Sequence, residues 1–371
     1  MLKSLQIKNM TAFSDAVFEF VPGLNVIMGE NITGKSHVLK MGYCILHSLH
    51  QLNVKQTLKQ TDIFDGSAIH QRFSKLLTEK VLNVFKPDAL GNLIQSNENL
   101  PSEIKAEITK EDHSQLITFS FRKNDHQLML DKFTKMDIHM PLFIPTNEVL
   151  TMLPEFPELY EKHYMSIDET YYDLCKALRI PLLKKVPDEL KRTVDSLEDV
   201  LGGKIIVQKS GHAYIQFSEN KQLEISLIAE GLRKLSTLIY LLRNGTISKG
   251  CTIFWDEAEN NLNPKYMTKI AKVLFSLVQS GIQVILVTHS LFLMKELSLL
   301  SEISSGKASC RFFNCSPDKN NIIVDYGDLL EDLPSVASLH EALRQDDREQ
   351  EFYVSYSNFM EVKDNNAIFE K

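Results

Sequence analysis

The chain carries, near its start, the stretch Gly29-Glu30-Asn31-Ile32-Thr33-Gly34-Lys35-Ser36. It fits the spacing G-x-x-x-x-G-K-[ST], and it lies between the strand pattern of residues 24–28 and apolar residues at helical spacing from Lys35 to about Gln51. The glycines let successive backbone N–H groups face phosphates, and the helix start adds a favourable dipole. We expect Lys35 to neutralise the β- and γ-phosphates of ATP and Ser36 to bind Mg²⁺. His37, the next residue, completes the predicted binding loop.

A second stretch, Cys251-Thr-Ile-Phe-Trp-Asp256-Glu257, ends in two carboxylates. Apolar and β-branched residues followed by acids are typical of a buried strand that ends at the carboxyl edge of a parallel sheet. Asp256 is suited to hold Mg²⁺ through water, and Glu257 to polarise the water that attacks the γ-phosphate. An ordinary acidic turn after a buried strand is the alternative.

Two further sites follow the same logic. The run from Gln283 to Thr288 reads as a buried strand, and His289 after it can hydrogen-bond the γ-phosphate. Ala229, Glu230 and Gly231 open a long helix, whose free N–H groups can face a phosphate where a glycine allows close approach. The alternatives are a histidine that caps the next helix and a plain glycine at a helix start.

Alternating strands and helices fill the chain from residue 227, with helices at 227–242 and 264–279 and strands at 251–255 and 283–288. This order predicts a parallel sheet with helices on its faces. Hairpins are expected within 1–20, 106–121 and 204–217, together with a strand at 141–145 and a helix at 187–201.

Composition narrows the class of protein. The 371 residues are 43% hydrophobic and 24% charged, as in soluble globular proteins, and the net charge is −7. An acidic protein is not held to DNA by bulk electrostatics, so only a weak, local DNA contact is expected. The five cysteines lack metal-ligand spacing and predict reduced thiols. With no apolar run long enough to span a bilayer, we expect a cytoplasmic protein without a membrane contact.

The order of these motifs resembles that of ABC-type ATPases of the SMC, RecF and OLD branch. Residues 229–234 correspond to the signature motif of that family. Residues 259–264 correspond to its D-loop, which places Asn263 near the nucleotide. Asn147 or Glu148 stands where the family has its Q-loop. The chain also resembles compact prokaryotic ATPases of phage-defence loci, such as those of the Septu and PARIS systems.

The resemblance implies an α/β P-loop fold: an ABC-type head with a mostly parallel sheet flanked by helices, an antiparallel β subdomain and a helical lobe. It places the ATPase domain at 1–330, with a nucleotide-binding core from 1–50 and 225–330 and an inserted lobe at 53–225. Residues 331–371 would form a helical tail that contacts a partner. It further implies a homodimer, or a larger assembly of dimers, that sandwiches ATP and controls a separate nuclease or toxin.

Three departures from the family pattern bear on turnover: Ala229 replaces a serine, Ala258 a proline and Asn263 an aspartate. Ala229 in particular keeps open a nucleotide-gated scaffold with little hydrolysis. A RecF-like ATPase that grips DNA directly is a further alternative. Only 192 residues separate Ser36 from Ala229 in the sequence, and they carry no sustained heptads, so long SMC-type coiled-coil arms are excluded.

Overall fold

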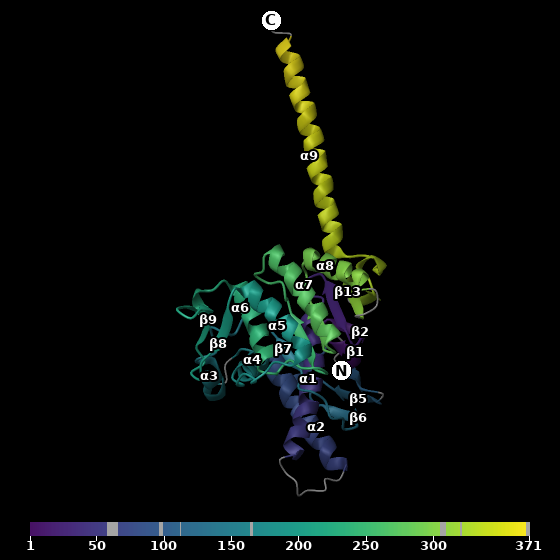
Figure 1. Cartoon of the computed structure of the whole chain (residues 1–371). Helices are drawn as coiled ribbons and strands as arrows, with labels where there is room; N and C mark the ends of the chain where they lie inside the picture. Colours follow the sequence, from purple (N-terminus) through teal and green to yellow (C-terminus); the bar gives the residue numbers. More distant parts are fainter. Residues whose placement is uncertain are drawn as a thin grey trace.

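The computed structural model of the chain (Figure 1) describes residues 1–57, 66–95, 99–111, 113–163, 166–304, 309–319 and 321–368. Its helices are α1 (Lys35–Thr57), α2 (Gly66–Phe85), α3 (Phe156–His163), α4 (Glu169–Leu178), α5 (Asp188–Leu201), α6 (Glu230–Arg243), α7 (Pro264–Gln279), α8 (Leu291–Ile303) and α9 (Ala337–Ile368). Its strands are β1 (Leu2–Met10), β2 (Phe13–Glu19), β3 (Leu24–Gly29), β4 (Ser102–Lys110), β5 (His113–Phe121), β6 (Met129–Lys132), β7 (Leu142–Ile144), β8 (Lys204–Val207), β9 (Ala213–Ser218), β10 (Lys221–Glu224), β11 (Thr252–Asp256), β12 (Gln283–Val287), β13 (Cys310–Asp318) and β14 (Asn321–Gly327).

The central sheet has the strand order β14-β13-β3-β12-β11-β7. All neighbours are parallel except β14, which pairs antiparallel with β13. β3 lies between β12 and β13, so its carboxyl end opens at the middle of one sheet edge. The strands β3, β12 and β11 therefore deliver the loop at 30–34, His289 and Asp256 to that same edge.

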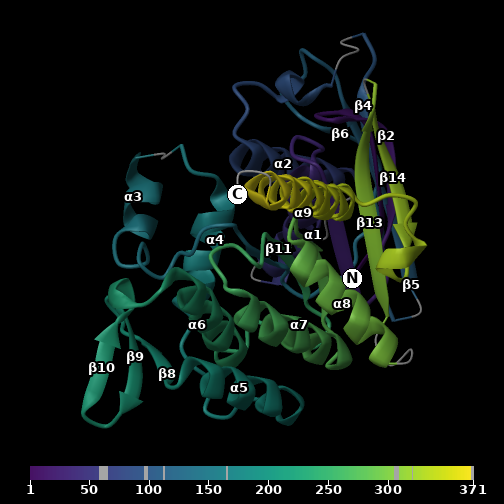
Figure 2. The same cartoon turned by 90° about the horizontal axis from the view of Figure 1, so that it is seen from above.

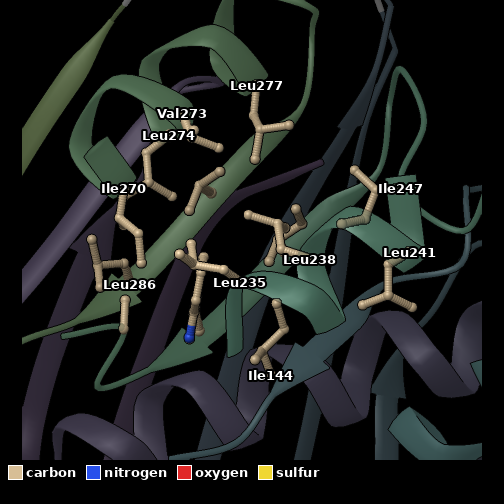
Figure 3. Packing of buried hydrophobic residues seen from close by; sticks show 14 of the residues in the cluster. Ile144, Leu235, Leu238, Leu241, Ile247, Ile270, Val273, Leu274, Leu277 and Leu286 are labelled. Carbon is tan, nitrogen blue, oxygen red and sulfur yellow. The ribbon is translucent and has the colours of Figure 1, made fainter. Parts of the chain in front are cut away.

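Two cores cover the two faces of this sheet. β11 and β12 are buried along their whole length, as expected of strands with helices on both sides. On one face, α6 and α7 pack through residues such as Leu235, Leu238, Ile270 and Leu274 (Figure 3), close to Leu286 of the sheet. On the other face, α1 packs between the central sheet and a second sheet.

The second sheet is antiparallel, with the order β2-β1-β4-β5-β6. Its apolar residues join α1 and α2 in the same core. A small third sheet, β10-β9-β8, lies beside α5 and α6 (Figure 2).

Helix α9 extends away from the rest of the molecule (Figure 1). With 32 residues it is about 48 Å long, at about 1.5 Å per residue. Its apolar side chains Leu343, Phe352, Tyr353 and Val354 are all more than half exposed.

The predicted fold class is confirmed: the chain is an α/β protein with a mostly parallel sheet, flanking helices and an antiparallel sheet. The helix predicted from 264 to 279 is α7, and the predicted hairpins are β1–β2, β4–β5 and β8–β9. The five cysteines are buried and unpaired, as expected. No helix among the described residues is both long and apolar enough to cross a membrane.

The expected division at residues 53 and 225 does not follow the sheets. Strand β7, inside the supposed insertion, pairs with β11 of the central sheet. Strand β4, also inside it, pairs with β1. Such pairings join segments far apart in the sequence, so the local pattern of apolar residues cannot predict them. Helix α6 also begins at Glu230, three residues later than predicted, because residues 225–227 form a 3₁₀ turn.

Candidate nucleotide site

The loop between β3 and α1 is shaped by glycines at both ends. Gly29 and Gly34 have φ angles of 143° and 80°, which side chains rarely tolerate. A Cβ on Gly29 would lie 2.2 Å from the carbonyl oxygen of Cys315, and one on Gly34 would lie 2.8 Å from the ring of Phe13. Phe13 is fully buried, which fits a core residue rather than a platform for adenine. At the tip, Ile32 has a φ of 70° and is 96% exposed.

Lys35 folds back over this loop. Its Nζ donates to the backbone oxygen of Gly29 at 3.0 Å, to that of Glu30, and to the hydroxyl of Thr33 at 3.3 Å. Burial lowers the pKa of Lys35, and nearby acidic groups that include Asp256 partly oppose this shift. These contacts are with neutral oxygens, so a phosphate could replace them with stronger, charge-assisted hydrogen bonds.

Ser36 meets Asp256 at the base of the loop. The Ser36 hydroxyl donates to Asp256 Oδ1 at 3.1 Å, although 220 positions separate the two in the sequence. Burial raises the pKa of Asp256, and the Ser36 hydrogen bond opposes that shift. A hydroxyl and a carboxylate oxygen in contact fit Mg²⁺, which prefers oxygen ligands and takes the rest from water and phosphates. Among the described residues, no group of three or more His, Cys, Asp or Glu could hold a metal by itself.

Glu257 and His289 face each other across the ends of β11 and β12. His289 Nδ1 lies 3.5 Å from Glu257 Oε1, and their side chains are 59% and 33% exposed, respectively. The amide of Glu257 donates to Val287, with a φ of 51° at Glu257 that turns its side chain out of the strand direction. Both residues line a cavity of about 620 Å³ together with Gly29, Glu30 and Asn31.

The same cavity has walls that the sequence did not indicate. They comprise Met28 of β3, Met294 of α8, Asn314 of β13, and Val336, Ala337 and Ser338 at the start of α9. The beginning of the long helix α9 therefore adjoins the space beside Glu257 and His289.

The start of α6 is partly open and partly packed. Ala229 is exposed and Glu230 half-buried, and the Ala229 side chain provides no cap. Gly231, by contrast, is buried: a Cβ there would lie 2.5 Å from Leu262 Cδ2 and 2.7 Å from the oxygen of Asn261. The missing side chain at Gly231 thus lets α6 pack against the turn after β11.

The candidate residues for the Q-loop and D-loop have structural partners. Glu148 forms an ion pair with Arg233 of α6 at 2.9 Å, and its side chain is 6% exposed. Asn147 hydrogen-bonds with Tyr171. Asn263 caps α7, its side chain accepting from the amide of Lys265 at 2.8 Å. Each of these contacts explains the residue without a nucleotide.

His37 lies in the first turn of α1, with its ring centroid 5.6 Å from that of Phe85. Burial, aided by Lys40, lowers the pKa of His37 to about 4, so the ring is neutral at pH 7. The positive charge at this end of the loop is therefore that of Lys35.

Glu259 was not among the site residues predicted from the sequence. Its carboxylate is 4% exposed and accepts hydrogen bonds from the segment Thr288–Ser290. Its only signal in the sequence is a third acid two residues after Glu257, because its burial and the donors that make burial possible appear only in the structure.

Residues 79–295, more than half of the chain, match the model of a family described as an AAA domain, putative AbiEii toxin, type IV toxin–antitoxin system. The chain belongs to this AAA family. The matched residues include Gly231, Asp256, Glu257 and His289, while the loop at 29–36 precedes them. None of the curated proteins matches the chain.

The fold has a counterpart among solved structures. The AAA-family chain is similar to an SMC head domain bound to the C-winged helix domain of ScpA, with a TM-score of 0.54 and 13% identity over 89% of this chain and 98% of that one. An SMC head domain from Thermotoga maritima also matches, with a TM-score of 0.48 and 12% identity over 87% and 98% of the two chains. The likeness to the first of these two structures shows that the chain has the fold of an SMC head domain.

Proposed function

We propose that the protein binds ATP with Mg²⁺, hydrolyses it, and uses the cycle as a switch. The observation that carries this proposal is the meeting of Ser36 with Asp256 at 3.1 Å, beside Glu257 and His289 at 3.5 Å. Four residues from three distant parts of the sequence converge at one sheet edge, next to a loop with the phosphate-binding spacing. A purely structural arrangement has no need for this combination.

Each side chain has a task in this proposal. Lys35 exchanges its bonds to Gly29 and Glu30 for bonds to the β- and γ-phosphates. Ser36 would bind Mg²⁺ directly and Asp256 would hold it through water; when bound, the ion would neutralise charge on the phosphate oxygens. Glu257 orients a water molecule from the adjoining cavity and accepts its proton, and His289 donates a hydrogen bond to the γ-phosphate.

The proposed closed state is a dimer in which each ATP lies between two copies of the chain. The start of α6 supports it, because Ala229 is exposed and Leu227 beside it is 72% exposed. The unpaired N–H groups of a helix start suit a phosphate brought by a second copy. Larger homo-oligomers would then be assemblies of such dimers.

We further propose that this cytoplasmic switch controls a separate toxin or nuclease in defence against phage. The family's description, which names a putative toxin and a toxin–antitoxin system, supports a link to such a system. The similar SMC head was solved with a domain of another protein, which supports a separate partner. We propose 1–330 as the ATPase domain and 331–371 as the partner-contact tail, since the apolar side chains of α9 at 352–354 are exposed.

A scaffold with little turnover is the second candidate, favoured by Ala229, which has no side-chain oxygen to meet a phosphate. The RecF-like alternative finds less support. The net charge of the chain is −7, and Lys185, one of the basic residues between 184 and 192, forms an ion pair with Asp188.

Phosphate release from ATP by the full chain, measured with and without Mg²⁺, tests the proposal. We expect Mg²⁺-dependent release that Asp256→Asn abolishes, because the amide keeps the shape of Asp256 but not its charge. ATP binding without release would favour the scaffold. An absence of ATP binding would overturn both.

A further inference from the structure

Glu259 is a buried acid to which the proposed mechanism assigns no task. It lies in the turn between β11 and α7, two residues after Glu257, and is 4% exposed. Burying a carboxylate is costly unless donors replace the lost water. The partners of Glu259 therefore indicate why the turn has an acid there.

Its donors all come from the loop after β12. Glu259 Oε1 accepts from the Thr288 hydroxyl at 2.7 Å, the His289 amide at 2.9 Å and the Ser290 amide at 3.2 Å. The imidazole Nδ1 of His289 lies 3.7 Å from the same oxygen. One carboxylate oxygen thus fixes three consecutive residues around His289. The other oxygen, Oε2, has no hydrogen-bond partner within the described chain.

The turn that carries Glu259 is itself held by α6. Lys234, which is 3% exposed, donates to the carbonyl oxygen of Glu257 at 3.2 Å. Burial lowers the pKa of Lys234, and the carboxylates of Glu230, Glu259, Glu257 and Asp256 oppose this shift. Leu262 and Asn261 of the same turn pack on Gly231. Helix α6 therefore holds the turn that carries Glu259, and its Lys234 supplies the positive charge that balances the Glu259 carboxylate.

We propose that Glu259 is a positioning residue for ATP hydrolysis: its carboxylate clamps the backbone of Thr288–Ser290 and so sets His289 beside Glu257. The clamp rests on the proposed function, because His289 matters only if it meets a phosphate. Glu259 acts through His289, and it holds the loop whether or not ATP is present.

Two variants separate the clamp from simple stabilisation. Glu259→Gln keeps an oxygen that can accept the same three hydrogen bonds, whereas Glu259→Ala removes it. We expect Glu259→Ala to lower kcat at least about tenfold with an ATP Kd within about threefold of wild type, and Glu259→Gln to retain most of the activity. In a His289→Ala background, Glu259→Ala should lower kcat by less than about twofold further, since residues that act through one another are not additive.

An independent effect of Glu259→Ala in the His289→Ala background, or an unchanged kcat in Glu259→Ala, would overturn the proposal. If Glu259→Ala fails to fold, Thr288→Val, which removes one of the three donors, takes its place in the same cycle.

Hydrogen exchange in nucleotide-free protein separates this inference from the function it rests on. Faster exchange of the His289 and Ser290 amides in Glu259→Ala than in Glu259→Gln supports the clamp even if the wild type hydrolyses no ATP. Equal exchange in both variants contradicts the clamp, whatever the ATPase assay gives.

Discussion

At the scale of single residues, Lys35 carries the positive charge closest to the proposed phosphates. Lys35→Ala should weaken ATP binding at least about tenfold, or about 1.4 kcal/mol, because neutral backbone oxygens are its present partners and a triphosphate offers charged ones. Titration calorimetry with Mg²⁺ measures this. Lys75→Ala, which alters a 74% exposed side chain on α2, is the matched control and should bind ATP normally. Unchanged ATP affinity in Lys35→Ala would show that residues 29–36 do not form the ATP-binding loop.

Glu257 is predicted to serve hydrolysis and not binding. Glu257→Gln should retain ATP affinity and lose turnover, because an amide cannot accept a proton from water. ATP then persists in the closed state, so size-exclusion chromatography with ATP should show a dimer that ADP does not produce. Glu79→Gln, on the exposed face of α2, should behave as the wild type in both assays. Full turnover in Glu257→Gln would assign the base to another residue.

The motif residues could be predicted from the sequence because each stands at a fixed offset from a strand with a strong local pattern. The partners of those residues could not. Glu259 appeared only as a member of the D-loop, and its contact with Thr288–Ser290 depends on β11 and β12 lying side by side. Gly231 was expected to admit a phosphate, and its packing on Leu262 became visible only in three dimensions.

At the scale of elements, we expect the packing of Gly231 on Leu262 to stabilise the contact between helix α6 and the turn after β11. Gly231→Ala should lower the free energy of unfolding by about 1–3 kcal/mol, since its Cβ would lie 2.5 Å from Leu262. Thermal or urea denaturation of the purified protein measures the loss. Leu227→Ala, three residues outside the helix and 72% exposed, should cost much less. A Gly231→Ala protein as stable as the wild type would mean that Leu262 and Asn261 can shift to make room for the added methyl group at little cost.

Helix α1 carries a buried histidine that predicts a dependence of stability on pH. Burial, followed by the nearby charge of Lys80, lowers the pKa of His47 from 6.5 to about 3 in the folded state. The unfolded chain therefore binds the proton first, and stability is full above about pH 6.5 and declines as the pH falls towards 3. The slope from this one group is about 1.4 kcal/mol per pH unit. Urea denaturation between pH 7 and 4.5 should show a shallower decline for His47→Leu, and an identical slope would contradict the assignment.

Some elements were not predicted from the sequence. Helix α4 was not predicted, and Asp173 in its middle is buried beside Lys80 of α2. The ion pair that allows this acid to be buried joins two helices far apart in the sequence, so only the structure shows it. Strand β13 was also missed, because its apolar run includes Asn314 and Pro317, yet it pairs with β3 next to the binding loop.

At the scale of the whole molecule, the proposed function requires two copies of the chain. In the closed dimer, the loop at 29–36 of one protomer and the start of α6 of the other protomer would bind the same ATP. Within one protomer, these two segments would therefore face different ATP molecules. Two lesions in separate halves of the site can therefore complement each other. Lys35→Ala impairs one half. For the other half Ala229→Glu is suitable, because Ala229 is exposed and tolerates a side chain, whereas Gly231 does not.

The most direct measurement is the ATPase activity of Lys35→Ala and Ala229→Glu proteins, alone and mixed in equal amounts. Each alone should be inactive, since both sites of its homodimer carry a lesion. In a mixed dimer one site collects both lesions and the other is intact, so random exchange should restore up to about a quarter of wild-type activity if the sites are independent. No recovery, with subunit exchange verified by a tagged pull-down, would contradict catalysis at a site shared between two copies.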